Sequence, residues 1–266
     1  MTFRLMPEYY AHARLLHLHL ILLGFVTVTL AGLLHRLLPV VLQTELYNPF
    51  LSRLVMWVIP AGFAILLGGF VTSSLRLELA VGVLLVLGVG LYAYNLFRTW
   101  VKSGHPGTAA SDHLLLAIFF LVLTMPMGVL IGANFIPELP VLPIGSLHLA
   151  AYTHMTLIGF MVHTLCGALS YGIPVLLAES RVPSQKKRGP YRDRLDAIMN
   201  RWRSVQLAGL SLGTMGLGVI AALTWNFPLT SLYVQLATWT TAGLLLAGLT
   251  LFAAKLAWAF GMDPTD

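Results

Sequence analysis

The chain has 266 residues, of which 58% are hydrophobic and only 10% are charged, and its formal net charge is +6. A soluble domain carries about 25% charged residues, so this composition excludes a chain whose whole surface faces water. In lipid, open sheets leave backbone groups unpaired, and the alternating pattern of a membrane barrel is absent here. The sequence therefore predicts an all-α fold: a polytopic membrane helix bundle that forms a single membrane domain over residues 1–266.

We expect about seven transmembrane helices, because apolar runs of at least 18 residues alternate with short polar stretches. Their predicted ranges are 13–39, 51–74, 78–101, 112–134, 147–177, 204–225 and 231–260. Breaker residues support the boundaries: Pro39 follows the first helix, and Asn48-Pro49 precedes the second. The first apolar run is too long for the core of a cleavable signal peptide. The single cysteine, Cys166, excludes both a disulfide framework and an iron–sulfur cluster.

The orientation follows from the basic residues, which concentrate on the cytoplasmic side of membrane proteins. The segment from Arg181 to Arg203 holds eight of the sixteen Lys and Arg residues. We therefore place the loop 178–203 in the cytoplasm and the N-terminus outside, in the inner (plasma) membrane of the cell. The basic run is interpreted as a topology determinant that contacts anionic membrane lipid. Docking of a cytoplasmic partner is the alternative, and the patch is too short to indicate nucleic acid.

The first and fifth helices resemble each other. When His19–Leu42 is shifted by 135 residues onto His154–Leu177, eleven of the twenty-four positions are identical, including His, Gly-Phe, Gly and Pro. Three helices lie between the two copies, which predicts a four-helix internal repeat, with repeat 1 at about 10–134 and an incomplete repeat 2 at about 145–262. Because four is an even number, both copies cross the membrane in the same direction. His19 and His154 are then expected at one depth, in the outer half of the bilayer.

Two imidazoles on facing helices at one depth are a known way to hold a heme iron from both sides. Ionisable side chains within a bilayer are costly and usually functional, so His19 and His154 are the candidate axial ligands. Gly24 and Gly159, with Gly32 and Gly167 eight residues further on, would let a flat macrocycle approach the backbone. Packing of helices through small residues explains the same glycines. Interhelical hydrogen bonds, another metal or a proton path remain alternatives for the histidine pair.

The other histidines give weaker signals. His17 points about 200° away from His19 on the helix and could serve a second heme; its repeat equivalent is Tyr152. For His163 we expect a hydrogen bond to a neighbouring helix. Interface positions are expected for His35, His105 and His113. His12 and His148 are expected near the outer surface, where they could contact a cofactor edge or an external partner; together with Arg14 they are candidates for a quinone site.

These residues resemble a known family, the catalytic subunit (subunit I) of heme–copper oxidases, most closely its C-type cytochrome c oxidases and the related nitric oxide reductases. The likeness covers two helices, about fifty residues, and rests on His17-Leu18-His19, Gly24-Phe25-Val26, Gly32, Leu34 and Pro39. It implies that His19 and His154 are the axial ligands of a low-spin heme b and that His17 corresponds to the high-spin heme ligand. The chain has about seven helices where the family has twelve or more, and it lacks the histidines that bind copper, so we expect no copper centre.

The leading interpretation is a membrane-embedded heme b electron-transfer subunit. It would pass electrons between quinol, or an external redox protein such as a cytochrome, and a partner subunit of a redox complex, without catalysis of its own. One alternative is a membrane protein that senses or handles heme, nitric oxide or copper without turnover. Another is a proton-coupled transporter that uses the histidines as a relay, although Glu78 is the single acidic residue that could lie within a spanning helix.

Overall fold

The structure is a computed structural model of the chain, and it describes residues 13, 16–133, 146–223 and 228–264. Within these ranges all regular secondary structure is helical, which confirms the all-α prediction. The elements are η1 (Leu20–Thr27), α2 (Val28–Val41), α3 (Pro49–Thr72), α4 (Leu75–Ser103), α5 (Ala109–Ala133), α6 (Ser146–His154), η2 (Met155–Val162), α7 (His163–Arg181), α8 (Gln185–Asn200), α9 (Arg203–Leu223) and α10 (Leu232–Gly261).

Within the described residues, seven helical spans are long and apolar enough to cross a membrane, as predicted, so the chain is built as a multi-pass membrane protein. They are Leu16–Val41, Pro49–Thr72, Leu75–Ser103, Ala109–Val129, Leu149–Arg181, Arg203–Leu223 and Leu232–Gly261. The side of the bundle presents large apolar side chains, among them Phe25, Trp57 and Trp239, each more than 70% exposed. Such a surface suits contact with lipid tails.

The predicted boundaries of α3 coincide with helix-capping residues. Asn48 precedes α3, and its side-chain oxygen accepts a hydrogen bond from the Leu51 backbone N–H at 2.9 Å. Pro49 then takes the first helical position, where a missing N–H costs nothing. At the other end of α3, Ser73 adopts the left-handed conformation and allows the sharp turn into α4.

Both histidine-bearing helices contain a π-helical segment, and the two segments are equivalent in the repeat. Segment η1 follows His19 and segment η2 follows His154; a shift of 135 residues places Leu20–Thr27 on Met155–Val162. π-Helices make up well under 1% of residues and are frequently found at functional sites. The same irregularity at the same place in both copies supports the predicted repeat.

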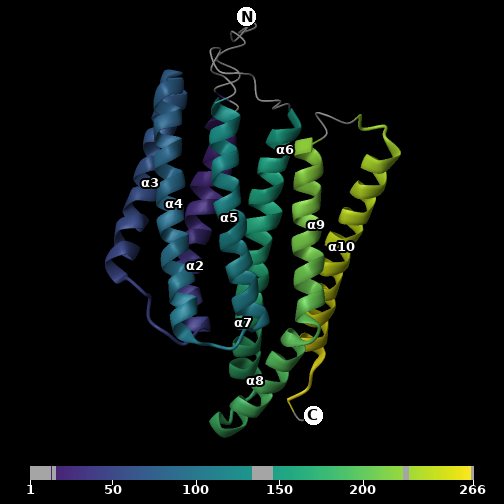
Figure 1. Cartoon of the computed structure of the whole chain (residues 1–266). Helices are drawn as coiled ribbons and strands as arrows, with labels where there is room; N and C mark the ends of the chain where they lie inside the picture. Colours follow the sequence, from purple (N-terminus) through teal and green to yellow (C-terminus); the bar gives the residue numbers. More distant parts are fainter. Residues whose placement is uncertain (1–12, 14–15, 134–145, 224–227, 265–266) are drawn as a thin grey trace, which may run out of the picture.

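The first and fifth spans are the centre of the bundle. Both run from the end at which the N-terminus lies toward α8, while α3 and α4 flank one side and α9 and α10 the other (Figure 1). Segment η1 packs against η2, and α2 packs against α7. The largest buried apolar cluster joins these central helices to α3, α4 and α5. The structure thus places the two candidate histidines on adjacent, parallel helices.

The basic segment 178–203 differs from the predicted loop, because most of it is a helix. Helix α8 lies across one end of the bundle (Figure 1) and buries Tyr191, Leu195 and Met199 against α7 and α10. Polar side chains of this segment bind the residue that follows α10: the Tyr191 hydroxyl of α8 and the Arg181 guanidinium at the end of α7 both donate to the Met262 carbonyl at 3.0 Å. Basic residues counted as a topology signal therefore also cap the C-terminus of α10.

Candidate functional site

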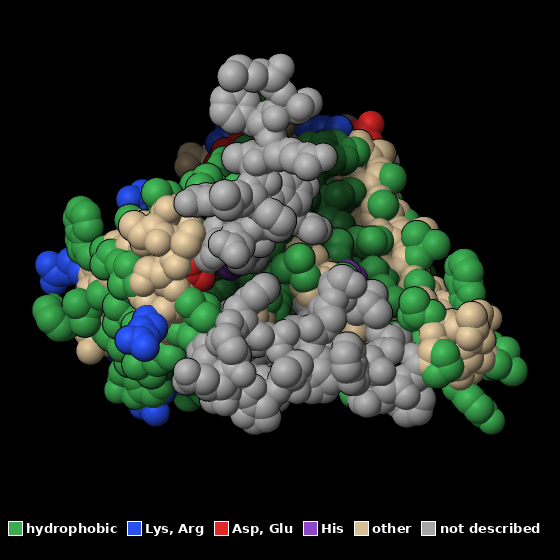
Figure 2. Space-filling model, turned by 90° about the horizontal axis from the view of Figure 1, so that it is seen from above, with side chains coloured by type: hydrophobic (Ala, Val, Ile, Leu, Met, Phe, Trp, Pro, Cys, Tyr) green, Lys and Arg blue, Asp and Glu red, His purple; other side chains and the backbone are tan. Residues whose placement is uncertain are grey.

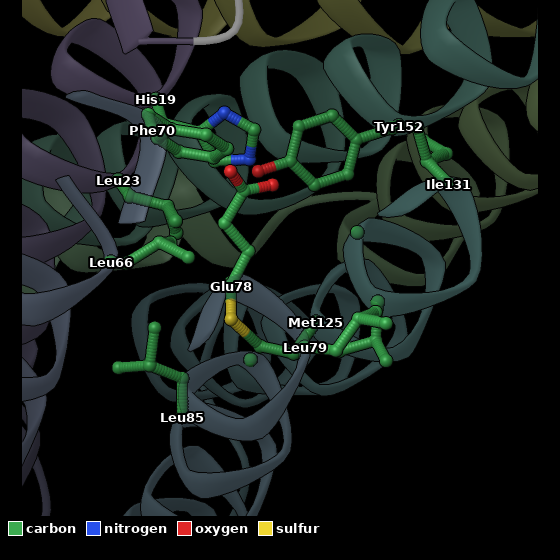
Figure 3. Close-up of a pocket in the computed structure, with 13 residues that line it drawn as sticks. His19, Leu23, Leu66, Phe70, Glu78, Leu79, Leu85, Met125, Ile131 and Tyr152 are labelled. Carbon is green, nitrogen blue, oxygen red and sulfur yellow. The ribbon is translucent and has the colours of Figure 1, made fainter. Parts of the chain in front are cut away.

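His19 lies in a cavity lined mainly by helices of the first repeat, with one side chain from the second. The cavity is largely apolar, and three polar side chains meet in it: His19, Glu78 from the first turn of α4, and Tyr152 from α6. The Glu78 carboxylate and the Tyr152 hydroxyl point toward the His19 imidazole (Figure 3). The His19 ring centroid is 4.9 Å from that of Phe70 and 5.9 Å from that of Tyr152. Figure 2 shows the molecule from above, where small areas of histidine side chain are visible among mostly hydrophobic side chains.

Glu78 is a buried carboxyl group, 8% exposed, within a membrane-length helix. An acidic side chain in this setting is costly and marks a functional hypothesis. Its position in the first turn of α4 favours negative charge, because the positive end of the helix dipole is there. Gly69 of α3 makes room for it, since a Cβ atom at that position would lie 2.9 Å from Glu78 Cγ. The carboxyl group is therefore held in place by the packing of α3 on α4.

His154 has different neighbours. Its ring lies within hydrogen-bonding reach of the Thr214 backbone on α9. Its Nε2 atom is buried and has no hydrogen-bond partner in the part of the chain that the structure describes. A buried nitrogen without a partner carries an uncompensated desolvation cost. His154 is thus a candidate for an interaction with a group from outside the chain.

The structure does not bring His19 and His154 into one cavity. Tyr152, and not His154, lines the cavity beside His19. Positions two apart on a helix point about 200° away from each other, which directs His154 toward α9 instead. The two histidines therefore share their place on adjacent parallel helices but face different helices of the bundle.

The glycines of the repeat accept side chains from neighbouring helices. A Cβ atom on Gly24 would lie 2.7 Å from the Phe63 ring of α3, and one on Gly159 would lie 2.6 Å from the Phe120 ring of α5. A Cβ atom on Gly167 would lie 2.7 Å from the Leu114 side chain of α5 and 3.0 Å from the Ala110 carbonyl oxygen. The packing interpretation of these glycines accounts for what the structure shows.

His17 is exposed and does not line the His19 cavity. Its repeat equivalent, Tyr152, is buried and does line that cavity. His12 and Arg14, two of the three candidates for an outer quinone site, lie outside the described residues. The side chain of the third, His148, is not described either.

A second group of polar side chains lies buried near α8, and sequence reasoning missed it as a group. His113 Nδ1 is 3.0 Å from His163 Nδ1, and Gln206 Nε2 is 2.8 Å from His113 Nε2. Lys255 Nζ donates to Gln206 Oε1 at 2.5 Å and to the Met199 carbonyl at 3.0 Å. We call these four side chains, from α5, α7, α9 and α10, the buried polar chain. All four are at most 3% exposed.

The chemistry of the donors fixes the direction of the buried polar chain. An ammonium group can only donate, so Lys255 determines that Gln206 Oε1 faces it and that the Gln206 amide N–H donates to His113. Neutral His113 must then carry its proton on Nδ1 and donate to His163 Nδ1. Neutral His163 consequently carries its proton on Nε2, a buried atom without a hydrogen-bond partner among the described residues.

Three histidine predictions can be compared with these contacts. The expected hydrogen bond from His163 to a neighbouring helix is confirmed, with His113 of α5 as the partner. His113, for which an interface position was predicted, is fully buried among the helices near the start of the fourth span. His35 is partly buried, hydrogen-bonds Ser52 of α3 and stacks on the Tyr92 ring. The sequence signal that could have revealed the buried polar chain is Lys255, a lone cation inside the last apolar span.

Comparisons of the chain with models of protein families, with curated proteins and with solved structures find no match.

Proposed function

We propose that the chain is a membrane-embedded cytochrome b subunit in which His19 and His154 hold one heme b. The observation that carries the proposal is the duplicated histidine, followed in both copies by a π-helical segment on adjacent parallel helices. A bound heme with two axial imidazoles supplies one-electron transfer without an open coordination position. We expect a second heme at His17 only if its exposed side chain gains a partner from outside the chain.

Two imidazoles are suitable axial ligands for this role, but the structure holds them in different surroundings, so the packing around both must rearrange. His154 supports the fit because its buried Nε2 has no hydrogen-bond partner in the described ranges. The rings of Phe63 and Phe120 now cover Gly24 and Gly159. In the proposal both rings turn away when the cofactor binds, and His19 and His154, which face different helices, also turn toward one another.

The residues around His19 would orient its imidazole as an axial ligand. A metal-binding histidine is usually oriented by a hydrogen-bonding partner on its other ring nitrogen. Glu78 and Tyr152 point toward the imidazole (Figure 3) and are the candidates for that task. His154 has the Thr214 backbone within reach for the same purpose.

The proposed location is the inner (plasma) membrane, with the α8 end in the cytoplasm and the N-terminus outside. The basic residues of the segment 178–203 support this orientation. The histidine pair would then lie toward the outer face, within reach of quinol or an external redox protein. A single heme near one face cannot carry electrons across the bilayer, so we expect partner subunits in a redox complex.

The test is a reduced-minus-oxidised absorption spectrum of the purified protein. We expect a sharp b-type α band that carbon monoxide does not shift and that His19→Ala and His154→Ala both abolish. His17→Ala is the matched control, since it changes an exposed histidine two residues from His19, and it should leave the band in place. Wild-type protein without heme, or an unchanged band in His154→Ala, would contradict the proposal.

A second candidate function is proton-coupled transport, and the buried polar chain favours it. A lysine and two hydrogen-bonded histidines inside the bundle are groups that can exchange protons. Proteoliposomes with an internal pH-sensitive dye would detect proton movement. The transport function requires that His163→Phe abolish this movement and that His17→Ala preserve it; loss of heme binding alone would have no effect on the assay.

A further inference from the structure

A second cavity lies where α8 meets the ends of the spanning helices. Its wall comes from five places in the chain: the end of α2, the connection before α5, the start of α5, α7 and α8. About 530 Å³ of empty space lies within it, part of it open to the surroundings. Polar side chains form much of its lining: Gln43, His105, Thr108, Ser170, Arg192, Asp196 and Asn200.

Two polar atoms in this lining are buried and have no hydrogen-bond partner among the described residues. One is the Ser170 hydroxyl, on a side chain that is only 4% exposed, and the other is His105 Nδ1. By contrast, Asn200 is occupied: it accepts from the Ala109 backbone N–H at 2.7 Å and donates to the Asp196 carbonyl at 2.8 Å. Buried polar groups in folded proteins nearly always have a partner, so Ser170 and His105 point to a ligand.

The cavity also carries one charge of each sign. Arg192 Nε is 3.6 Å from Asp196 Oδ2, which is longer than the 2.7–2.9 Å typical of a charge-assisted hydrogen bond. The guanidinium stacks on the Tyr171 ring, 5.5 Å from its centroid. Burial raises the pKa of the Asp196 carboxyl, although Arg192 opposes the shift. Both side chains are partly exposed, 40% for Arg192 and 39% for Asp196, so the carboxylate is accessible to a second cation.

The depth of the cavity matches the headgroup region of a bilayer. Val41 ends the first spanning helix, Ala109 begins the fourth, and both line the cavity. Near the same end of the bundle, Arg201 stacks on Trp202 and Trp258, and tryptophan is enriched at membrane–water interfaces.

We propose that this cavity binds the headgroup of a phospholipid that carries a phosphate and a primary ammonium group, that is, phosphatidylethanolamine. Arg192, Ser170 and His105 donate to the phosphate oxygens, and Asp196 accepts hydrogen bonds from the ammonium group. An anionic headgroup without the amine leaves Asp196 facing negative charge. A choline headgroup offers the positive charge but no N–H donor. The site does not depend on heme binding.

The experiment measures the melting temperature of the delipidated protein in detergent with added lipid. Phosphatidylethanolamine, phosphatidylcholine and phosphatidylglycerol with identical acyl chains are compared. We expect phosphatidylethanolamine to bind about tenfold more tightly than the other two, the effect of one charge-assisted hydrogen bond. Soluble phosphoethanolamine is the fourth ligand; if it stabilises as well as the lipid does, the ligand is a soluble amino phosphate and the membrane source is wrong.

Three variants test the residues. Asp196→Asn should abolish the preference over phosphatidylcholine, and Ser170→Ala should weaken phosphatidylethanolamine binding. Arg201→Gln is the matched control, because it removes an exposed cation outside the cavity lining, and it should leave the preference unchanged. Equal binding of all three lipids by the wild type, or the same loss in Arg201→Gln as in Asp196→Asn, would overturn the proposal. Melting without lipid shows that each variant is folded.

Discussion

The two copies of the repeat share a backbone feature but differ in what surrounds it. In each, a histidine is followed by eight π-helical residues. His19 lies in a cavity with a buried carboxyl group. His154 lies against the backbone of α9, and its buried Nε2 atom has no hydrogen-bond partner among the described residues. The two helices related by the shift of 135 residues thus share the backbone irregularity, while the helices packed against them differ. The chemistry of each histidine is set by those neighbours.

The halves also differ in how their helices meet. Around the first repeat, glycines such as Gly24 accept the side chains of neighbouring helices. In the second, α9 and α10 approach backbone to backbone: a Cβ atom on Gly213 would lie 2.6 Å from the Leu245 backbone nitrogen. Lys255 and Gln206 add a buried polar contact between the same two helices. The α9–α10 pair should therefore tolerate substitution least.

The largest effect should come from Gln206→Leu. This change leaves the Lys255 ammonium with one known acceptor, the Met199 carbonyl, and removes the donor to His113. Breaking a buried charged contact by removing one partner costs about 3–5 kcal/mol. The measurement is the free energy of unfolding in detergent micelles.

Lys255→Met is the comparison for this site, because it removes the charge together with its desolvation cost. Its loss should be smaller, about 1–2 kcal/mol for acceptors that lose their donor. A larger loss in Lys255→Met than in Gln206→Leu would show that the ammonium itself stabilises the pair of helices.

A smaller loss is expected from Gly213→Ala, about 2–3 kcal/mol, because the new methyl group meets backbone atoms that cannot turn aside. Gly243→Ala on α10 is the control, since nothing lies within 4 Å of its virtual Cβ. It should be neutral or stabilising by up to about 1 kcal/mol through helix propensity. If both variants unfold alike, the close approach of α9 and α10 is not the cause.

The corresponding change in the first half, Gly24→Ala, should cost about 1 kcal/mol, because the Phe63 ring can shift. Gly32→Ala on the same helix meets only ordinary contact, 3.8 Å from Met56 Cε, and serves as the control in the same unfolding measurement. A loss for Gly24→Ala equal to that for Gly213→Ala would remove the distinction between the two halves.

The smallest effect should come from Tyr191→Phe, which deletes the hydroxyl that donates to the Met262 carbonyl at 3.0 Å. The expected loss is about 0.5–1 kcal/mol, the net contribution of one hydrogen bond. Because α8 caps α10, the loss should appear as faster hydrogen exchange at the end of α10, read by mass spectrometry. Unchanged exchange there would show that Tyr191 does not hold the end of the chain.

Composition and periodicity determined the bundle, because a chain this apolar can satisfy its backbone in lipid only as helices. The number of spans, their approximate ends and the repeat of His19 at His154 were all readable from local residues, since prolines and apolar run lengths act within one segment. The hydrogen bond of His163 to another helix was likewise predictable from its depth.

Only the tertiary structure decided which groups meet. Glu78 reaches His19 because α4 packs beside the first helix, and His113 finds Gln206, ninety-three residues away, because α5 packs beside α9. The segment 178–203 became a helix because Tyr191 and Leu195 had the ends of α7 and α10 to cover. Helix rotation and neighbour choice depend on side chains distant in the sequence, so no local pattern could give them.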